Sequence, residues 1–217
     1  VLGLPGGLRW YAQHDADAYD PPRRFADELT AGGPRSWPTL ATRRWRHTHE
    51  FADRGDGTTL LSDTVDTPVP ARLLRSTFRY RHRQTADDLA AHRTAAQAGM
   101  TPLTVAITGA SGMIGGALSP FLSGRGDEVV HLVRRPARTA AEISWDPEQR
   151  VLDPAALSGV DAVVHLAGVN VGDKRWTPSR KQEIFASRVD STHTLAAALA
   201  EADHPIRLVS QSAVGYY

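Results

Sequence analysis

Hydrophobic and polar residues follow different patterns in the two halves of the chain. From about residue 103 onward, short and continuous apolar runs alternate with longer mixed segments. Such runs are typical of strands that are covered on both faces of a parallel sheet. Strands are predicted at residues 103–108, 128–133, 143–145, 162–166 and 206–210, and helices at residues 112–123 and 177–202. This alternation predicts an α/β fold with a Rossmann-type parallel sheet in the order 3-2-1-4-5, right-handed crossovers and an incomplete C-terminal part.

The first hundred residues instead alternate with the period of a half-buried strand. In residues 44–51, polar residues separate four side chains that share one face, namely Trp45, His47, His49 and Phe51. A turn sequence at residues 53–57 and a second strand-like run at residues 58–65 follow, which together predict a hairpin. Residues 71–98 contain neither Gly nor Pro and predict a long helix.

A small, polar segment at residues 94–102 separates the two patterns, so we place the domain boundary there. The expected domains are residues 1–99 and residues 103–217. The chain begins at Val1 without a methionine and ends at Tyr217, inside a segment that carries candidate chemistry. We therefore interpret it as part of a longer protein.

Composition removes several classes of function. The formal net charge is +1, so no bulk field attracts nucleic acid or an anionic membrane, and the chain has no cysteine for disulfides or thiolate metal sites. No apolar run reaches the ~20 residues that span a bilayer. Arginines gather between residues 72 and 93 without aromatic residues interleaved on one face, which favours a solvated helix over RNA binding. We expect a cytoplasmic protein with no nucleic-acid partner and no membrane attachment.

A glycine-rich turn follows the strand predicted at residues 103–108 and leads directly into a helix. Gly109 permits the tight turn, Gly112 lets a pyrophosphate approach the backbone, and Gly115 lets the helix pack close to the sheet. Free N–H groups and the helix dipole favour an anion at this point. The alternative is a glycine-rich turn with no ligand. The predicted cofactor contacts in this loop are Gly109, Ser111, Gly112, Met113, Ile114 and Gly115.

Two arginines end the second strand of the predicted sheet. NAD-binding sites usually place Asp or Glu at this corner to hold the ribose 2′-hydroxyl. Here the strand runs into Arg134 and Arg135, and a guanidinium can bind a 2′-phosphate in a bidentate manner. The pair therefore favours NADP(H) as the cofactor. The alternative is a solvated pair of surface charges.

The glycine spacing G-x-x-G-x-x-G and the segment at residues 161–168 resemble the short-chain dehydrogenase/reductase superfamily. His165 lies within that apolar segment and is interpreted as a core histidine whose hydrogen bonds are satisfied. Further motifs narrow the resemblance: Arg134-Arg135-Pro136, Ser144-Trp145-Asp146, Asn170, Arg175-Trp176, Ser187-Arg188-Val189 and residues 208–217. With these, residues 103–217 resemble the atypical extended short-chain dehydrogenases of the "epimerase family protein" group, without the C-terminal substrate-binding portion.

This resemblance implies further site residues. Leu166, Ala167 and Gly168 would line the nucleotide, and Glu183 and Arg188 would lie near the adenosine and phosphates. It also implies two catalytic residues in the pattern Ser-x-x-x-Tyr: Ser212, which would hydrogen-bond the reacting carbonyl, and Tyr216, which would lie beside the nicotinamide. The usual proton donor is the tyrosine of Tyr-x-x-x-Lys, but none of the five tyrosines is followed by such a lysine.

The first hundred residues resemble the polyketide-cyclase/START-like (SRPBCC) superfamily. The resemblance rests on residues 21–27, 33–34, 45–51, 57–58, 63 and 78–82. It implies an α+β helix-grip fragment that holds an apolar ligand and lacks its first strands. His-x-His at His47 and His49 can bind metal, but the sequence offers no convincing third ligand, so no metal site is expected.

Two functions remain in competition at this point, beside a third possibility, a truncated gene product without activity. The first is an NADP(H)-dependent oxidoreductase or epimerase that acts on an unidentified small molecule. The alternative is a non-catalytic NADP(H)-binding sensor or apolar-ligand carrier. The missing Tyr-x-x-x-Lys favours the alternative, and Ser212 favours the enzyme.

Overall fold

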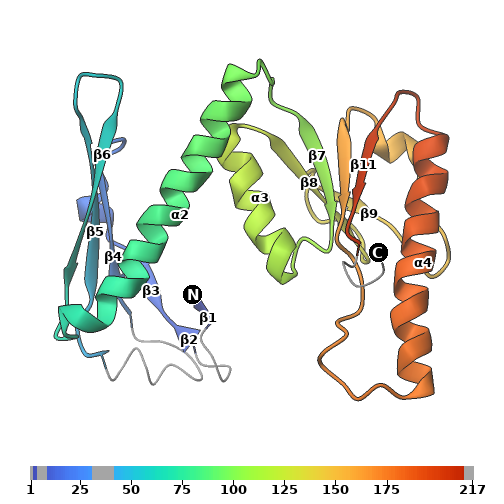
Figure 1. Ribbon diagram of the computed structural model, residues 1–217, viewed down its shortest axis with the longest axis horizontal. Coiled ribbons are helices and arrows are strands. Elements are labelled where there is room, and N and C mark those ends of the chain that lie inside the picture. The colour runs from blue at the N-terminus through green and yellow to red at the C-terminus, as the bar shows by residue number, and fades with distance from the viewer. Residues whose placement is uncertain (1, 4–8, 31–41, 213–217) are drawn as a thin grey trace. The chain divides into compact units, whose positions relative to one another are not determined.

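A computed structural model describes residues 2–3, 9–30 and 42–212 of the 217-residue chain. The chain divides into two compact units, Val1–Thr85 and Ala86–Tyr217, which we treat separately. The long helix α2 (Ala71–Gln97) begins in the first unit and ends in the second (Figure 1). The helix predicted from the absence of Gly and Pro is thereby confirmed.

The second unit is built on a five-stranded sheet in which every pair of strands is parallel. Its strands are β7 (Thr104–Thr108), β8 (Glu128–Val133), β9 (Glu142–Ser144), β10 (Ala162–His165) and β11 (Arg207–Ser210). The spatial order is β11-β10-β7-β8-β9, which is the predicted 3-2-1-4-5 arrangement. The strand order reverses between β7 and β10, and open α/β sheets bind their ligands at such a switch point.

Helices cover this sheet on its two faces (Figure 1). Helix α3 (Met113–Arg125) packs against β7 and β8, and helix α4 (Pro178–Ala200) follows β10. A 3-10 turn, η3 (Pro154–Leu157), precedes β10. One face of the sheet forms the main core together with α4 and η3. The buried residues of that core are Ala106, Val130, Leu132, Trp145, Leu152, Leu157, Val160, Val163, Leu195 and Ala198.

The apolar strands of the second unit are explained by this double cover. Ala106 lies opposite Val130 on one side and Val163 on the other, so the three share a face. Side chains alternate along a strand, so Val105 and Ile107 point to the other face, and both are buried. Burial on both faces is why these strands show continuous hydrophobic runs rather than alternation.

The first unit contains a four-stranded antiparallel sheet in the order β3-β4-β5-β6. Its strands are β3 (Ala12–His14), β4 (Arg24–Leu29), β5 (Arg46–Asp53) and β6 (Thr59–Asp66). The predicted hairpin is confirmed as β5 and β6. A short pair, β1 (Leu2–Gly3) with β2 (Arg9–Trp10), and a 3-10 turn, η2 (Ala16–Ala18), complete the described elements.

The alternating pattern of β5 corresponds to one buried face. His47 and His49 are 3% and 7% exposed, whereas Glu50 on the same strand is exposed. Phe78 of α2 packs edge-on against His47, with ring centroids 5.2 Å apart. Burial lowers the pKa of the His49 imidazole, and the neighbouring His47 lowers it further.

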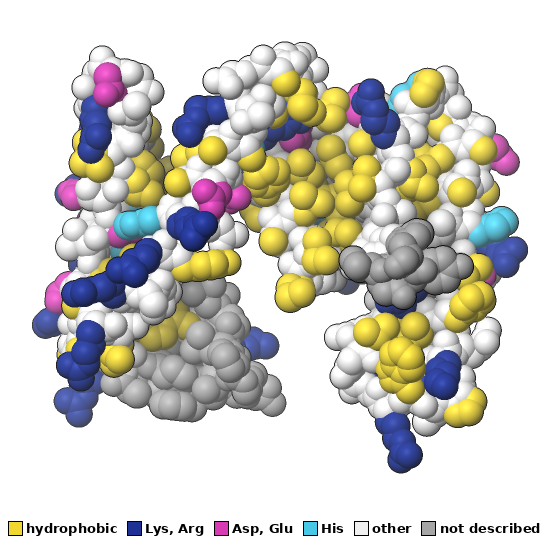
Figure 2. Space-filling view, viewed as in Figure 1, with side chains coloured by type: hydrophobic (Ala, Val, Ile, Leu, Met, Phe, Trp, Pro, Cys, Tyr) yellow, Lys and Arg dark blue, Asp and Glu magenta, His cyan; other side chains and the backbone are white. Residues whose placement is uncertain are grey.

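Helix α2 has no buried residue along its described length, in agreement with a solvated helix. The basic residues of this helix are arginines, and Figure 2 shows basic side chains at separate points along the face that is turned to the viewer. Among the described helices, none is both long enough and apolar enough to cross a bilayer.

Candidate functional site

A cavity of about 760 Å³ opens at the carboxyl ends of β7, β8 and β10. Its walls come from the glycine turn after β7, the end of β8, the segment after β10 and one side of α4. Nine of the predicted site residues line it: Gly109, Ser111, Gly112, Arg134, Arg135, Leu166, Ala167, Gly168 and Glu183. Residues that are distant in the sequence therefore meet at the position expected for a dinucleotide.

The glycine turn leaves no room for side chains at two of its positions. Gly109 has a φ of +69°, and a Cβ there would lie 2.9 Å from the backbone carbonyl of Leu166. A Cβ at Gly115 would lie 2.5 Å from the carbonyl oxygen of Gly109 and 2.6 Å from the Cα of Ala110. Gly115 thus permits the close approach of helix and turn, whereas the sequence analysis placed its close contact between the helix and the sheet.

The start of helix α3 presents backbone N–H groups beside the glycine turn. Its N-cap residue is Gly112, which makes no side-chain capping bond. The first N–H groups of a helix have no acceptor within the helix, so they remain available to a ligand. A Cβ at Gly112 would meet only the carbonyl oxygen of Gly109, at 3.1 Å. The absence of a side chain there keeps the approach to these N–H groups open.

Met113 and Ile114, two of the predicted cofactor contacts, are the first residues of α3. Their side chains are 90% and 46% exposed, and neither residue lines the cavity. Gly115 is buried behind the turn and does not line the cavity either.

A buried network holds the segment after β10 against the glycine turn. The hydroxyl oxygen of Thr108 accepts hydrogen bonds from the backbone N–H groups of Leu166 and Ala167, both at 3.0 Å. The same oxygen lies 2.7 Å from Nδ1 of His165, and Nε2 of His165 lies 3.1 Å from the hydroxyl of Ser191. Since Thr108 has one proton, it donates to Nδ1, and Nε2–H of His165 donates to Ser191.

His165 is therefore the satisfied core histidine that the sequence predicted. It is 4% exposed, and burial lowers the pKa of its imidazole, which keeps the ring neutral. Its role is to fix one wall of the cavity rather than to act on a ligand.

The arginine corner differs from its prediction in one respect. Arg135 donates two hydrogen bonds to the carboxylate of Glu142, at 2.8 and 2.6 Å, and both residues line the cavity. The hydrogen bonds from Arg135, together with one from the backbone N–H of Arg138, lower the pKa of Glu142 to about 2. Arg134 also lines the cavity and makes no ion pair within the described residues. Of the two guanidiniums, Arg134 is the one whose charge is not already matched.

Sequence reasoning missed Glu142 because it lies eight positions beyond Arg134 rather than at the end of β8. The parallel pairing of β8 with β9 brings it to the corner, with His131 opposite Glu142 in register. The three-residue strand β9 was predicted, but its register depends on contacts that no local pattern encodes.

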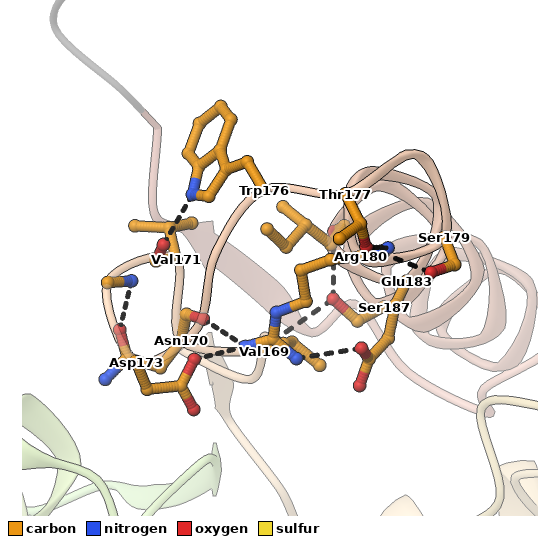
Figure 3. Close-up of polar contacts among 12 residues, drawn as sticks. Val169, Asn170, Val171, Asp173, Trp176, Thr177, Ser179, Arg180, Glu183 and Ser187 are labelled. Carbon is orange, nitrogen blue, oxygen red and sulfur yellow. Dashed lines mark hydrogen bonds and ion pairs between the residues drawn. The ribbon is translucent and has the colours of Figure 1, made fainter.

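A buried arginine organises the segment that joins β10 to α4 (Figure 3). Arg180 is 6% exposed and donates to the carbonyl oxygen of Asn170 at 2.5 Å, to Glu183 at 2.8 Å and to Asp173. Its Nε is buried and has no partner within the described residues. The indole N–H of Trp176 donates to the carbonyl oxygen of Val171 at 2.7 Å and closes the same segment on itself.

Two predicted cofactor residues make contacts in this region. Glu183 lines the cavity, but its carboxylate is held by Arg180. Arg188 does not line the cavity: it donates to the carbonyl oxygens of Val169 and Ile184, at 3.3 and 3.1 Å. A Cβ at Gly168 would lie 3.3 Å from the Arg188 guanidinium, so the glycine makes room for it. Nothing in the sequence pattern singled out Arg180 as the centre of this arrangement.

The two predicted catalytic residues lie at the C-terminal limit of the described structure. Ser212 follows β11 at the carboxyl edge of the sheet, is exposed and does not line the cavity. Tyr216 lies outside the described residues.

Sequence comparison relates the second unit of this chain to a known family. Residues 105–217, just over half of the chain, match the NAD dependent epimerase/dehydratase family. An epimerase family protein of Mycobacterium leprae is 47% identical over 113 residues, which are 52% of this chain and 36% of that protein. One of Mycobacterium bovis is 44% identical over 118 residues, 54% of this chain and 39% of that protein. The chain thus spans less than two fifths of the length of these curated relatives.

A solved structure extends the likeness to both units. The nucleoside-diphosphate sugar epimerase from Corynebacterium glutamicum is 38% identical and superposes with a TM-score of 0.78. That similarity covers 99% of this chain and 44% of that one.

Proposed function

This chain belongs to the NAD dependent epimerase/dehydratase family, and we propose that its cavity binds NADP(H) for an oxidoreductase or epimerase-like reaction on an unidentified small molecule. The observation that carries the proposal is the glycine turn. Added Cβ atoms would collide with backbone at Gly109 and Gly115 and narrow the approach to the helix start at Gly112. A turn that excludes side chains beside free N–H groups fits a pyrophosphate.

The cofactor would lie across the carboxyl ends of the strands. The N–H groups at the start of α3 would hold the pyrophosphate, and the segment at Leu166 and Ala167 would line the nucleotide. Arg134 would contact the 2′-phosphate of the adenosine ribose. Glu142 neutralises Arg135 without removing the charge of Arg134, so the corner favours a phosphate over a bare hydroxyl.

The cofactor supplies hydride transfer to or from the substrate carbon when it is bound. The chain would bind, orient and polarise the substrate. The hydroxyl of Ser212, which follows β11 on the ligand-binding side of the sheet, would donate a hydrogen bond to a substrate carbonyl oxygen as negative charge develops. Tyr216 would lie beside the nicotinamide.

A second candidate is a protein that binds NADP(H) or an apolar ligand without turnover. It is favoured by the first unit, where an antiparallel sheet is followed by the long helix α2. We propose that residues 1–99 form a partial START-like domain for an apolar molecule and that residues 103–217 form the dinucleotide-binding domain. The substrate and partner would then be small molecules.

One experiment separates the two candidates. The purified chain is mixed with NADPH and a panel of carbonyl compounds, and the nicotinamide absorbance is followed. The enzyme proposal predicts substrate-dependent oxidation of NADPH, and the Ser212→Ala variant should be slower. Saturable NADPH binding without oxidation by any carbonyl would favour the carrier.

A further inference from the structure

The buried face of the first unit gathers histidines and aspartates from three strands and from α2. In the sheet register, Asp27 of β4 lies opposite His47 of β5, and Asp63 of β6 lies opposite His49. The side chains of both histidines and of Asp63 are less than 10% exposed, and that of Asp27 is 24% exposed. The sequence analysis saw His-x-His without a third ligand because the partners come from neighbouring strands.

Asp63 fixes the proton positions of the two histidines. Its Oδ1 lies 3.0 Å from Nε2 of His47 and 2.7 Å from Nδ1 of His49, and its Oδ2 contacts Nε2 of His82. An ionised carboxylate only accepts hydrogen bonds, so each of these ring nitrogens carries a proton and donates it. In the neutral rings the lone pairs are consequently on Nδ1 of His47 and Nε2 of His49.

Those two lone pairs converge on a third acceptor. Nδ1 of His47 and Nε2 of His49 each lie 3.8 Å from Oδ1 of Asp27. The three ligand atoms all lie within 4.8 Å of one another. A separation of 3.8 Å is too long for a hydrogen bond, so protonating either ring would not join it to Asp27 in this geometry. Among the described residues, these three acceptors therefore face one point with the donor set that a cation binds.

The spacing is close to that of a metal site. Ligands about 2.0–2.1 Å from a tetrahedral zinc ion lie about 3.3 Å from one another. Both distances from Asp27 exceed this value by about 0.5 Å, and all three ligand atoms lie within 4.8 Å of one another, so the carboxylate and both imidazoles would have to draw together around the ion. A carboxylate that orients metal-binding imidazoles through their other nitrogens is the usual outer layer of such sites, and Asp63 has that position for both rings.

We propose that Asp27, His47 and His49 bind a divalent transition-metal ion such as Zn²⁺, with Asp63 as the residue that positions both imidazoles. Two imidazoles and one carboxylate are a ligand set that zinc accepts. Three protein ligands leave a coordination position for water or for an oxygen atom of a ligand. The site belongs to the first unit and does not depend on dinucleotide binding in the second.

The test is a calorimetric titration of the whole chain with Zn²⁺, repeated with Co²⁺ to record its visible absorption. Because the chain has nine histidines, variants must separate this site from stray binding. Asp27→Asn and His49→Gln should each weaken Zn²⁺ binding by at least about tenfold. The matched controls are Glu50→Gln, on the exposed side of β5, and His14→Gln, an exposed histidine of the same unit; both should bind like the parent chain.

The positioning role of Asp63 has its own readout. Asp63→Asn should change the Co²⁺ absorption spectrum and weaken binding by about 10- to 100-fold, because the amide no longer fixes both rings. Circular dichroism shows whether His49→Gln folds. If it does not, Asp27→Asn still tests the proposal, because Asp27 is partly exposed and its replacement disturbs the fold less. One tightly bound Zn²⁺ per chain, lost in Asp27→Asn, is the expected result. Absence of such binding, or equal binding by parent and Asp27→Asn, would overturn the proposal.

Discussion

The glycine turn and the arginine corner, at the two ends of the cavity, present different kinds of chemical group. At the glycine turn the groups that would face a ligand belong to the backbone, because the glycines there have no side chains. At the arginine corner the groups are the long side chains of Arg134 and Arg135, which directly follow β8, and the charge of Arg135 is matched by Glu142 of β9. In the proposed function, the first end would hold the pyrophosphate that all nicotinamide dinucleotides share. The second end would distinguish NADP(H) from NAD(H), because its charges would meet the ribose at which the two cofactors differ.

This contrast implies that damage at the two ends should differ in kind. A change at the turn should remove binding of every dinucleotide, whereas a change at the corner should alter the preference between two cofactors.

The largest effect is expected at the turn. Gly112→Asp adds a side chain and a negative charge where the pyrophosphate must lie, so affinity for NADPH and NADH should fall by at least about a thousandfold. Gly116→Ala is the matched control, because its Cβ would lie 3.8 Å from the nearest neighbour, an ordinary contact. Calorimetry on both variants decides: unchanged binding in Gly112→Asp would refute the role of the turn.

The next effect concerns turnover. Ser212→Ala should lower kcat by about a hundredfold while leaving cofactor affinity nearly intact, because a bond to a developing negative charge strengthens in the transition state. If Ser212 instead bonds only the backbone, the variant should lose thermal stability and keep its kcat. Measuring kcat and the thermal midpoint on the same sample separates the two roles.

At the corner, Arg134→Gln should weaken the binding of NADPH by about 10- to 100-fold and leave the binding of NADH almost unaffected. Only NADPH offers a 2′-phosphate to the guanidinium. Arg207→Gln, at the opposite end of the sheet on β11, is the control. Equal weakening of both cofactors in Arg134→Gln would mean that the arginine has a structural role.

The smallest effect concerns the pair of Arg135 and Glu142. The pKa of Glu142 is lowered from 4.5 to about 2 in the folded chain. A lowered carboxyl pKa stabilises the folded state above the unfolded pKa, and this contribution disappears as the pH falls from 4.5 toward 2. The parent chain should therefore melt slightly above Glu142→Gln at pH 7, and the difference should vanish near pH 2. A difference that persists unchanged at low pH would contradict the ion pair.

The same contrast explains what the sequence could predict. The glycine turn is contiguous, follows a buried strand and opens a helix, so its position could be predicted from the local pattern. The sheet order was accessible too, because alternating strands and helices leave few topologies open. Glu142 and the Asp27–His47 pair were not, because each depends on the register between neighbouring strands. Arg180 was not, because its contacts depend on the path of the loop between β10 and α4, which no periodic pattern encodes.

The most direct test of the account is a calorimetric titration of the whole chain with NADPH and, separately, with NADH. The account predicts one NADPH bound per chain, with an affinity at least about tenfold above that for NADH. Failure of both cofactors to bind would contradict the cavity as a dinucleotide site. NADH binding as tightly as NADPH would leave the glycine turn in place but contradict the role of Arg134 at the ribose.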